Sequence, residues 1–168
     1  VYITHIYAYD EVQNVVSVAA PKVDVPATNV NPNRLPGGTY RIACYSNPKF
    51  GIDVEAISTA DEANVHVWEY VGGKNQHFNV TFDTDHYNFQ AVHSGKNIDL
   101  YKAGSAAGTN VMQYTPDGTA VQNWTLRDAG DGAYYIVNSN GLYLDAANGT
   151  IANGTNVQGW TGNESDAQ

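Results

Sequence analysis

Charged residues are scarce in this sequence of 168 residues, where Asp, Glu, Lys and Arg together make up 15%. Only 8 of them are Lys or Arg, against 17 Asp or Glu, so the formal net charge is −9. No stretch clusters basic side chains, and binding to a phosphate backbone depends on such clusters. The composition therefore argues against a nucleic-acid partner.

Cysteine is also nearly absent, because Cys44 stands alone and cannot form a disulfide within the chain. Its strand-like surroundings predict a small buried hydrophobic residue, with a reactive thiol as the less favoured alternative. The five histidines are scattered singly, without metal-ligand spacing. No apolar run is long enough to span a membrane. We therefore expect no metal site, no cofactor and no membrane insertion.

Turn-forming and β-forming residues are abundant instead, among them 16 Gly and 12 Tyr. Long helical stretches of Ala, Leu, Glu and Lys are missing. This is the composition of short strands joined by many turns, and the length suits one domain with a core of its own. The sequence predicts an all-β domain.

The sequence repeats with a constant period. Asp53, Asp99 and Asp145 are separated by 46 residues each. Three further sets keep the same spacing of 46: Asn64, Asn110 and Asn156; Trp68, Tyr114 and Trp160; Gln76, Gln122 and Gln168. A period in this range indicates a repeat architecture, in which every repeat adopts the same local shape.

We divide the chain into repeat one (38–84), repeat two (85–130) and repeat three (131–168). Each repeat contains four strand-like segments, which in repeat one are roughly 39–45, 51–56, 64–70 and 76–82. A β-propeller typically needs at least four blades, so three repeats fit a closed barrel capped by hairpins better. Closure also removes exposed strand edges.

Residues 1–37 lie outside the repeats. The β-branched and aromatic residues of segment 1–10 predict a strand, and the four prolines of segment 21–37 predict an extended connector. Repeat three stops at Gln168, one strand short of the other two repeats. We hypothesise that residues 1–10 occupy the vacant twelfth strand position. The alternative is that the chain is a fragment and that residues 1–36 are an upstream linker.

Two short elements suggest a family. One is Gln-x-Trp, complete at Gln122-Asn123-Trp124, with Phe for Trp at Gln76-His77-Phe78, and begun at Gln168. The other is Val-Gln-x-Trp, clearest at Val157-Gln158-Gly159-Trp160. Over residues 38–168 the sequence resembles the ricin-B type, or R-type, lectins. The resemblance implies a β-trefoil that binds glycans of the galactose or GalNAc type without catalysis.

The resemblance also implies a role for each repeated position. A carboxylate accepts hydrogen bonds from two sugar hydroxyls, an aromatic ring covers the C–H face, and an amide fixes the orientation. Repeat one supplies Asp53, His66, Trp68 and Asn75, followed by Gln76. His66 stands where the family often has Gln, and can donate or accept.

The other two repeats are less complete. Repeat three offers Asp145, Gln158 and Trp160, but Ala167 replaces the amide. Repeat two offers Asp99 and Tyr114, but Met112 and Val121 stand at the positions of its two polar partners. We expect sugar binding to rank repeat one first, then repeat three, then repeat two. The purely structural alternative is that each Asp only accepts hydrogen bonds from the backbone amides of its own turn.

Other repeated residues are expected to build the scaffold. The three Gln amides should tie the repeat ends together, and Phe78 and Trp124 should lie in the core. The remaining predicted core residues are Ile42, Val54, Val65, Ile98, Leu100, Val111, Ile136, Leu144 and Val157.

Three functions compete at this stage. The first is a lectin whose partners are glycans or glycoconjugates, with a secreted or extracellular location favoured and fungal cytoplasm as the alternative. The second is a carbohydrate-binding module of a larger glycoside hydrolase. The third is a β-trefoil protease inhibitor using variable loops such as 46–50 or 83–87. No constellation of nucleophile and base indicates an enzyme. The sequence leaves the sugar and the oligomeric state open.

Overall fold

The computed structural model describes residues 3–9, 15–16, 34–163 and 168. Within these residues the chain is all-β and has no α-helix, as predicted. The strands are β1 Ile3–Tyr9, β2 Val15–Val16, β3 Gly38–Cys44, β4 Asn47–Val54, β5 Val65–Glu69, β6 Phe78–Asp83, β7 His86–Ala91, β8 Asn97–Leu100, β9 Thr109–Tyr114, β10 Trp124–Gly130, β11 Ala133–Asn138, β12 Leu142–Ala146 and β13 Thr155–Thr161. Most of the proline-rich segment predicted as a connector lies outside the described residues.

Five short 3₁₀ turns punctuate the strands: η1 Glu55–Ile57, η2 Lys74–Gln76, η3 Tyr101–Ala103, η4 Ala120–Gln122 and η5 Ala147–Gly149. The strand predicted to end at residue 56 ends at Val54 instead, because η1 begins at the next residue. Ala56 and Ile57 both have positive φ there, and a strand cannot continue through left-handed backbone.

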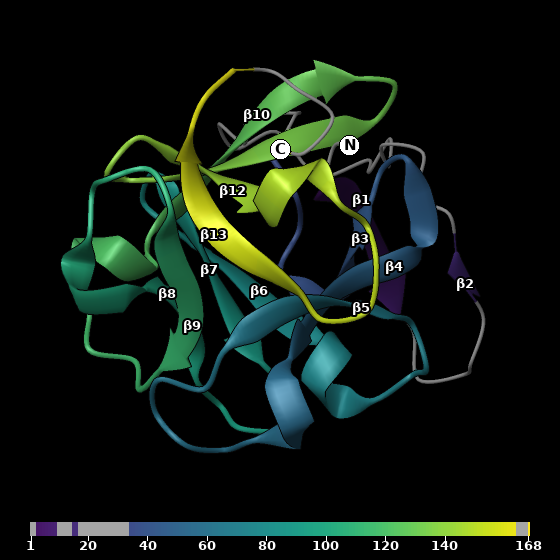
Figure 1. Ribbon diagram of the computed structural model, residues 1–168, viewed down its shortest axis with the longest axis horizontal. Helices are drawn as coiled ribbons and strands as arrows, with labels where there is room; N and C mark the ends of the chain where they lie inside the picture. Colours follow the sequence, from purple (N-terminus) through teal and green to yellow (C-terminus); the bar gives the residue numbers. More distant parts are fainter. Residues whose placement is uncertain (1–2, 10–14, 17–33, 164–167) are drawn as a thin grey trace, which may run out of the picture.

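Three antiparallel hairpins surround the centre of the molecule as seen in Figure 1. They are β4–β5, β8–β9 and β12–β13. β13 pairs with both β5 and β9, and an isolated bridge joins Asn64 to Met112. The second strand of each hairpin therefore meets the other two hairpins, which places the three hairpins around one axis.

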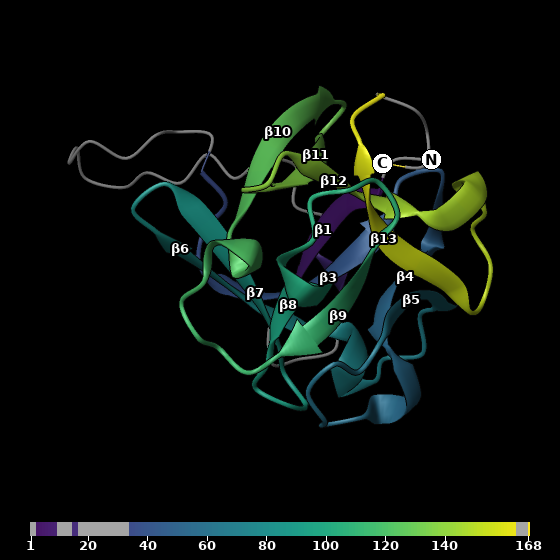
Figure 2. The ribbon, with the colours of Figure 1, turned by 60° about the vertical axis from the view of Figure 1, so that its left-hand side comes forward.

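The other strands form the wall of a barrel. β3 pairs with β6, β6 with β7, β7 with β10 and β10 with β11. In Figure 2 the hairpin β6–β7 begins at the left and the hairpin β10–β11 stands at the top. A barrel wall capped by three hairpins is the β-trefoil arrangement that the sequence predicted.

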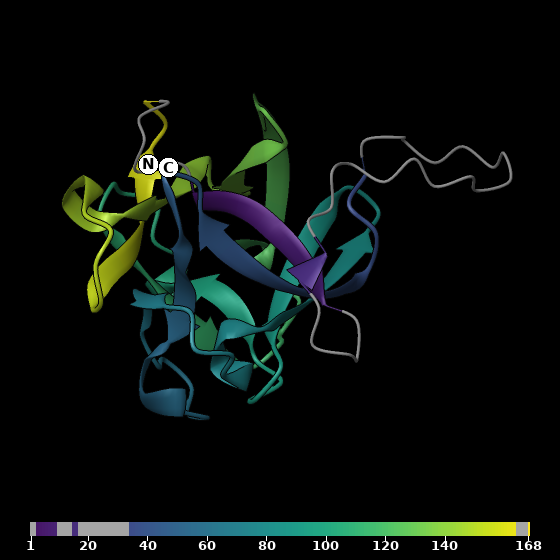
Figure 3. The same cartoon turned by 90° about the vertical axis from the view of Figure 1, so that its right-hand side faces the viewer.

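β1 lies along β3 (Figure 3) and next to β11. Its register against β3 resembles the register of β6 against β7 and of β10 against β11. Ile3 faces Cys44 and Ile6 faces Ile42, as Phe78 faces Ala91 and Val80 faces Phe89, and as Trp124 faces Asn138 and Leu126 faces Ile136. A one-residue irregularity between Ile3 and His5 separates β1 from the other two pairings.

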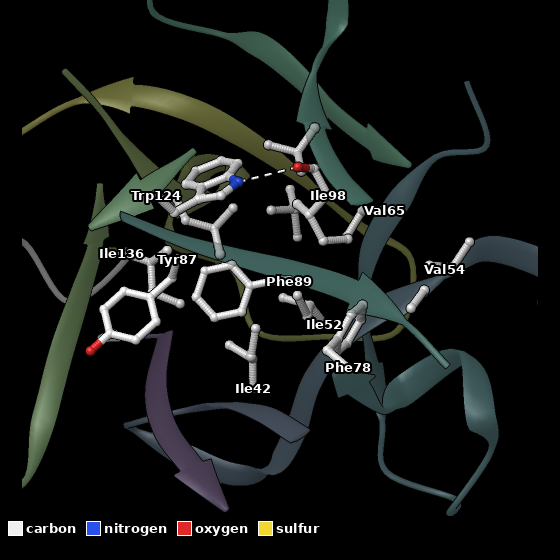
Figure 4. Packing of buried hydrophobic residues seen from close by; sticks show 14 of the residues in the cluster. Ile42, Ile52, Val54, Val65, Phe78, Tyr87, Phe89, Ile98, Trp124 and Ile136 are labelled. Carbon is white, nitrogen blue, oxygen red and sulfur yellow. Dashed lines mark hydrogen bonds between the residues drawn. The ribbon is translucent and has the colours of Figure 1, made fainter. Parts of the chain in front are cut away.

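The core fills the space between the barrel and its cap, as Figure 4 shows. All nine predicted core residues, together with Phe78 and Trp124, are buried. The indole Nε1 of Trp124 donates a hydrogen bond to the carbonyl oxygen of Ile98 at 3.1 Å, so the largest core side chain has a partner for its polar atom. Cys44 is also buried, and this burial raises the pKa of its thiol to about 12. The thiol is therefore an inert core group, as predicted.

Asparagine side chains link the three hairpins near their common axis. Asn110 donates to Asn64 at 3.0 Å, and Asn156 donates to Asn110 at 2.8 Å. The sequence showed these residues in register but gave them no role. Their side-chain amides join one repeat to the next, which keeps the hairpins in a fixed orientation.

No helix among the described residues could cross a membrane.

Candidate functional site

Each hairpin of the cap places the repeated Asp and the repeated aromatic residue on one face. In β4–β5, Asp53 lies opposite His66, and Trp68 lies opposite Gly51. Side chains two residues apart along a strand share a face, and so do residues directly opposite each other. The same pairing holds in the other hairpins. The register is Asp99 with Met112 and Tyr114 with Asn97 in β8–β9, and Asp145 with Gln158 and Trp160 with Tyr143 in β12–β13.

Repeat one brings four of its five predicted site residues into contact. Asp53 is buried, and its Oδ1 lies 3.0 Å from Nε2 of His66. Its Oδ2 accepts a hydrogen bond of 2.8 Å from Nδ2 of Asn75. The His66 ring stacks on Trp68, with centroids 5.0 Å apart and planes 20° apart. Trp68 is 36% exposed. A carboxylate fixed from two sides thus lies beside an exposed ring.

Gln76, the fifth predicted residue, bonds the backbone next to the site. Its buried side chain donates to the carbonyl of Glu69 at 2.9 Å and accepts from the amide N–H of Val71 at 2.9 Å. Gln168 makes the equivalent bonds, donating to Thr161 O at 2.7 Å and accepting from Asn163 N at 2.9 Å. In both repeats the amide ties the end of the aromatic strand to the segment that follows it.

Repeat three assembles a simpler site. Gln158 Nε2 donates to Asp145 Oδ1 at 2.9 Å, and Trp160 on the same face is 38% exposed. Burial raises the pKa of the Asp145 carboxyl, and the bond from Gln158 partly opposes the rise. Ala167 lies outside the described residues. Tyr143, opposite Trp160, adds a second ring to this face; the sequence analysis missed it, although its position two residues before Asp145 is a usable signal.

Repeat two has a different arrangement around its carboxylate. Met112 and Val121 are buried and bring no polar group, and Gln122 Nε2 bonds Asp99 Oδ2 at 2.9 Å. Asn97 in turn donates to Gln122 Oε1 at 3.0 Å. Burial raises the pKa of the Asp99 carboxyl, with the Gln122 bond acting against the rise. Gln122 thus supplies the contact to this carboxylate that His66 and Asn75 supply in repeat one and Gln158 supplies in repeat three.

Metal binding finds no support in the described part of the chain, where no three His, Cys, Asp or Glu side chains form a group that could hold an ion. The chemistry available in repeats one and three is hydrogen bonding by a carboxylate with polar neighbours and apolar contact on an exposed indole. That combination suits a polyhydroxylated ring with one C–H face.

Comparison with protein families gives the class. Residues 29–114 and 74–160 match the model of the ricin-type β-trefoil lectin domain. The chain belongs to this family, as its sequence elements suggested. No curated protein sequence matches it significantly.

Solved structures share the fold. A designed three-fold symmetric protein, ThreeFoil, is 36% identical with a TM-score of 0.74, over 77% of this chain and 94% of ThreeFoil. The Macrolepiota procera ricin B-like lectin, solved in complex with lactose, is 21% identical with a TM-score of 0.69, over 81% and 94% of the two chains. An exo-β-1,3-galactanase from Clostridium thermocellum is 24% identical with a TM-score of 0.73, over 77% of this chain and 28% of the enzyme.

Proposed function

We propose that this domain is a non-catalytic lectin that binds glycans through repeats one and three. One observation carries the proposal: in both repeats a buried aspartate, held by a polar side chain, shares a hairpin face with a partly exposed tryptophan. In repeat two, Met112 and Val121 replace the two polar partners and Tyr114 replaces the tryptophan, so we assign this repeat to the scaffold.

The geometry suggests how a sugar binds. The unused lone pairs of the Asp53 or Asp145 carboxylate accept hydrogen bonds from two neighbouring hydroxyls, each such charged bond contributing about 1.5–3 kcal/mol. Trp68 or Trp160 covers the C–H face of the ring. In repeat one, Asn75 and His66 fix the carboxylate before the sugar arrives, which lowers the entropic cost of binding.

Galactose or GalNAc-type glycans are the proposed ligands. The lactose complex of the Macrolepiota procera lectin supports this choice, since lactose contains galactose. The alternative is that the domain is the carbohydrate-binding module of a larger glycoside hydrolase. The galactanase favours this alternative, because this chain spans only 28% of that enzyme. The full-length reading frame discriminates between the two.

The proposed domain layout has three repeats of about 46 residues, at 38–84, 85–130 and 131–168. The segment before the repeats, residues 1–37, contains β1 and β2. We further propose that β1 takes the position of the fourth strand of repeat three. Its register against β3 and its place beside β11 support this layout.

The test is a glycan array with the wild type and three tryptophan or tyrosine variants. Trp68→Ala and Trp160→Ala remove partly exposed rings, so both variants should fold normally and lose about tenfold or more in binding at their own site. Tyr114→Ala in repeat two is the matched control and should bind like the wild type. A folded wild type that binds no glycan would overturn the proposal.

A further inference from the structure

The residue opposite the repeated Asp differs in chemical character from one hairpin to the next. The facing pairs are His66 with Asp53, Met112 with Asp99, and Gln158 with Asp145. Of the three side chains that face an Asp, only the imidazole can change its charge between about pH 5 and pH 8. Repeat one is therefore the repeat in which the carboxylate can acquire a charged neighbour.

His66 contacts both groups on which the proposed repeat-one site depends. Its Nε2 lies 3.0 Å from Oδ1 of Asp53, and its ring stacks on Trp68 with 5.0 Å between the centroids. The side chains of His66 and Asp53 are only 9% and 7% exposed. When Asp53 is ionised, Nε2 must donate, because a carboxylate only accepts. A second proton on the ring therefore goes to Nδ1 and turns this hydrogen bond into an ion pair.

Asp53 is the charged group that His66 contacts in the described part of the chain. The strands packed against β5 are β4, β9 and β13, and β13 contains no titratable residue. The other ionisable side chains on these strands and on η1 and η2 are Lys49, Glu55, Glu69, Lys74 and Tyr114. None of them forms the ion pair or the hydrogen bond of His66, so Asp53 is the group that responds to a proton on the ring.

A proton on His66 weakens the Asp53 carboxylate as an acceptor for sugar hydroxyls. The imidazolium compensates the negative charge of the carboxylate, and bonds to an ionised acceptor are roughly twice as strong as bonds between neutral groups. The charged ring also stays on the face of Trp68, where a cation is favoured. Protonated His66, Asp53 and Trp68 thus satisfy one another, and a sugar gains less by contacting them.

We propose that His66 is a positioning residue that makes sugar binding in repeat one depend on pH, with tighter binding when the imidazole is neutral. The inference rests on the proposed lectin function and adds a means of regulation to its repeat-one site. In repeat three the neutral amide of Gln158 bonds Asp145 instead, so this site keeps its affinity over the same pH range. In slightly acidic solution repeat one releases its ligand while repeat three retains it.

Calorimetric titration with lactose at about pH 8 and about pH 6 tests the proposal. The Trp160→Ala background isolates repeat one, and the Trp68→Ala background isolates repeat three. The affinity of repeat one should fall about three- to tenfold from the higher to the lower pH. Because the coupling is reciprocal, sugar binding near pH 6 should also release protons. The dependence of the measured heat on the ionisation enthalpy of the buffer reports this release, and repeat three should show neither effect.

Two exchanges at one position are the matched variants. His66→Gln gives repeat one the residue of repeat three and should remove the pH dependence and the proton release. Gln158→His, in the Trp68→Ala background, should introduce both into repeat three. Where the glycan array selects another soluble glycan, that glycan replaces lactose in every titration.

The outcomes separate this inference from the lectin function itself. A repeat-one affinity that is equal at both pH values, or a pH dependence that survives in His66→Gln, would overturn the role of His66 and leave the lectin function intact. A folded wild type that binds neither lactose nor any array glycan at either pH would overturn the lectin function and this inference together.

Discussion

Asp99 lies in a repeat that has Met112 and Val121 at the positions of His66 and Asn75 in repeat one. With Met112 opposite it and Val121 nearby, its buried carboxylate accepts its bond from Gln122. Burial raises the pKa of this carboxyl above its ordinary value of 3.8. A raised pKa means that the folded state binds the proton more tightly than the unfolded state. The free energy of unfolding therefore falls as pH rises from 3.8 through the folded pKa.

Asp99→Asn removes that ionisation, and its side-chain oxygen can still accept from Gln122. We expect the variant to be more stable than the wild type at neutral pH, with a Tm about 2–4 °C higher. The difference should vanish below pH 3.8, where the wild-type carboxyl is protonated in both states. Calorimetric melting between pH 3 and pH 7 measures this dependence.

Asp61→Asn is the control with the opposite sign. The hydrogen bonds from Lys96 and Thr115 lower the pKa of the exposed Asp61 carboxyl. Its ionised form therefore stabilises the fold above the ordinary pKa, and this contribution is lost as pH falls through the lowered folded pKa. The control should be slightly less stable than the wild type at neutral pH. Equal effects of the two substitutions would show that the burial of Asp99 does not matter.

At the scale of elements, strand β1 is the candidate for closing the barrel. It pairs with β3 and lies beside β11, in a register like that of the fourth strands of repeats one and two. If β1 closes the barrel, deletion of residues 1–16 leaves β3 and β11 with unpaired edges. We expect the free energy of unfolding to fall by more than about 3 kcal/mol, because a strand-length set of hydrogen bonds and apolar contacts is lost.

Complementation gives the stricter test of β1. A synthetic peptide with the sequence of residues 3–9 should restore part of the lost stability of the truncated chain, measured by urea denaturation. A peptide with Ile6 replaced by Pro is the control, because proline lacks the N–H of the ladder and fits only sheet edges. Full stability of the truncated chain without peptide would refute the closing role.

The sequence predicted the strands and hairpins well where a residue pattern repeats. The 46-residue register placed the three Asp and the three aromatic residues on matching hairpins, and the alternation of apolar residues gave the core. It did not predict that Gln122, besides its scaffold bond to the carbonyl of Thr115, also bonds Asp99, because that contact joins η4 to β8 and depends on the three-dimensional neighbours of the carboxylate.

The whole molecule arranges its sites around one axis. β13 of repeat three pairs with β5 of repeat one, and the chain of Asn64, Asn110 and Asn156 holds the hairpins together. The proposed sites of repeats one and three therefore lie on hairpins that are hydrogen-bonded to one another. Two weak sites held in this way would gain affinity only on glycans spaced to reach both.

Retention on a glycan-coated surface should therefore depend on both sites at once. The wild type should bind a densely coated surface about 10²-fold more tightly than the free sugar, and Trp68→Ala or Trp160→Ala alone should remove most of that gain. Each single variant should still bind one equivalent of free sugar in calorimetry, where the wild type binds two. Surface plasmon resonance at decreasing glycan density separates the two contributions, since the advantage of the wild type must disappear once neighbouring glycans are too far apart to reach both sites. A wild type that binds one equivalent of free sugar and shows no dependence on density would mean that a single repeat does all the binding.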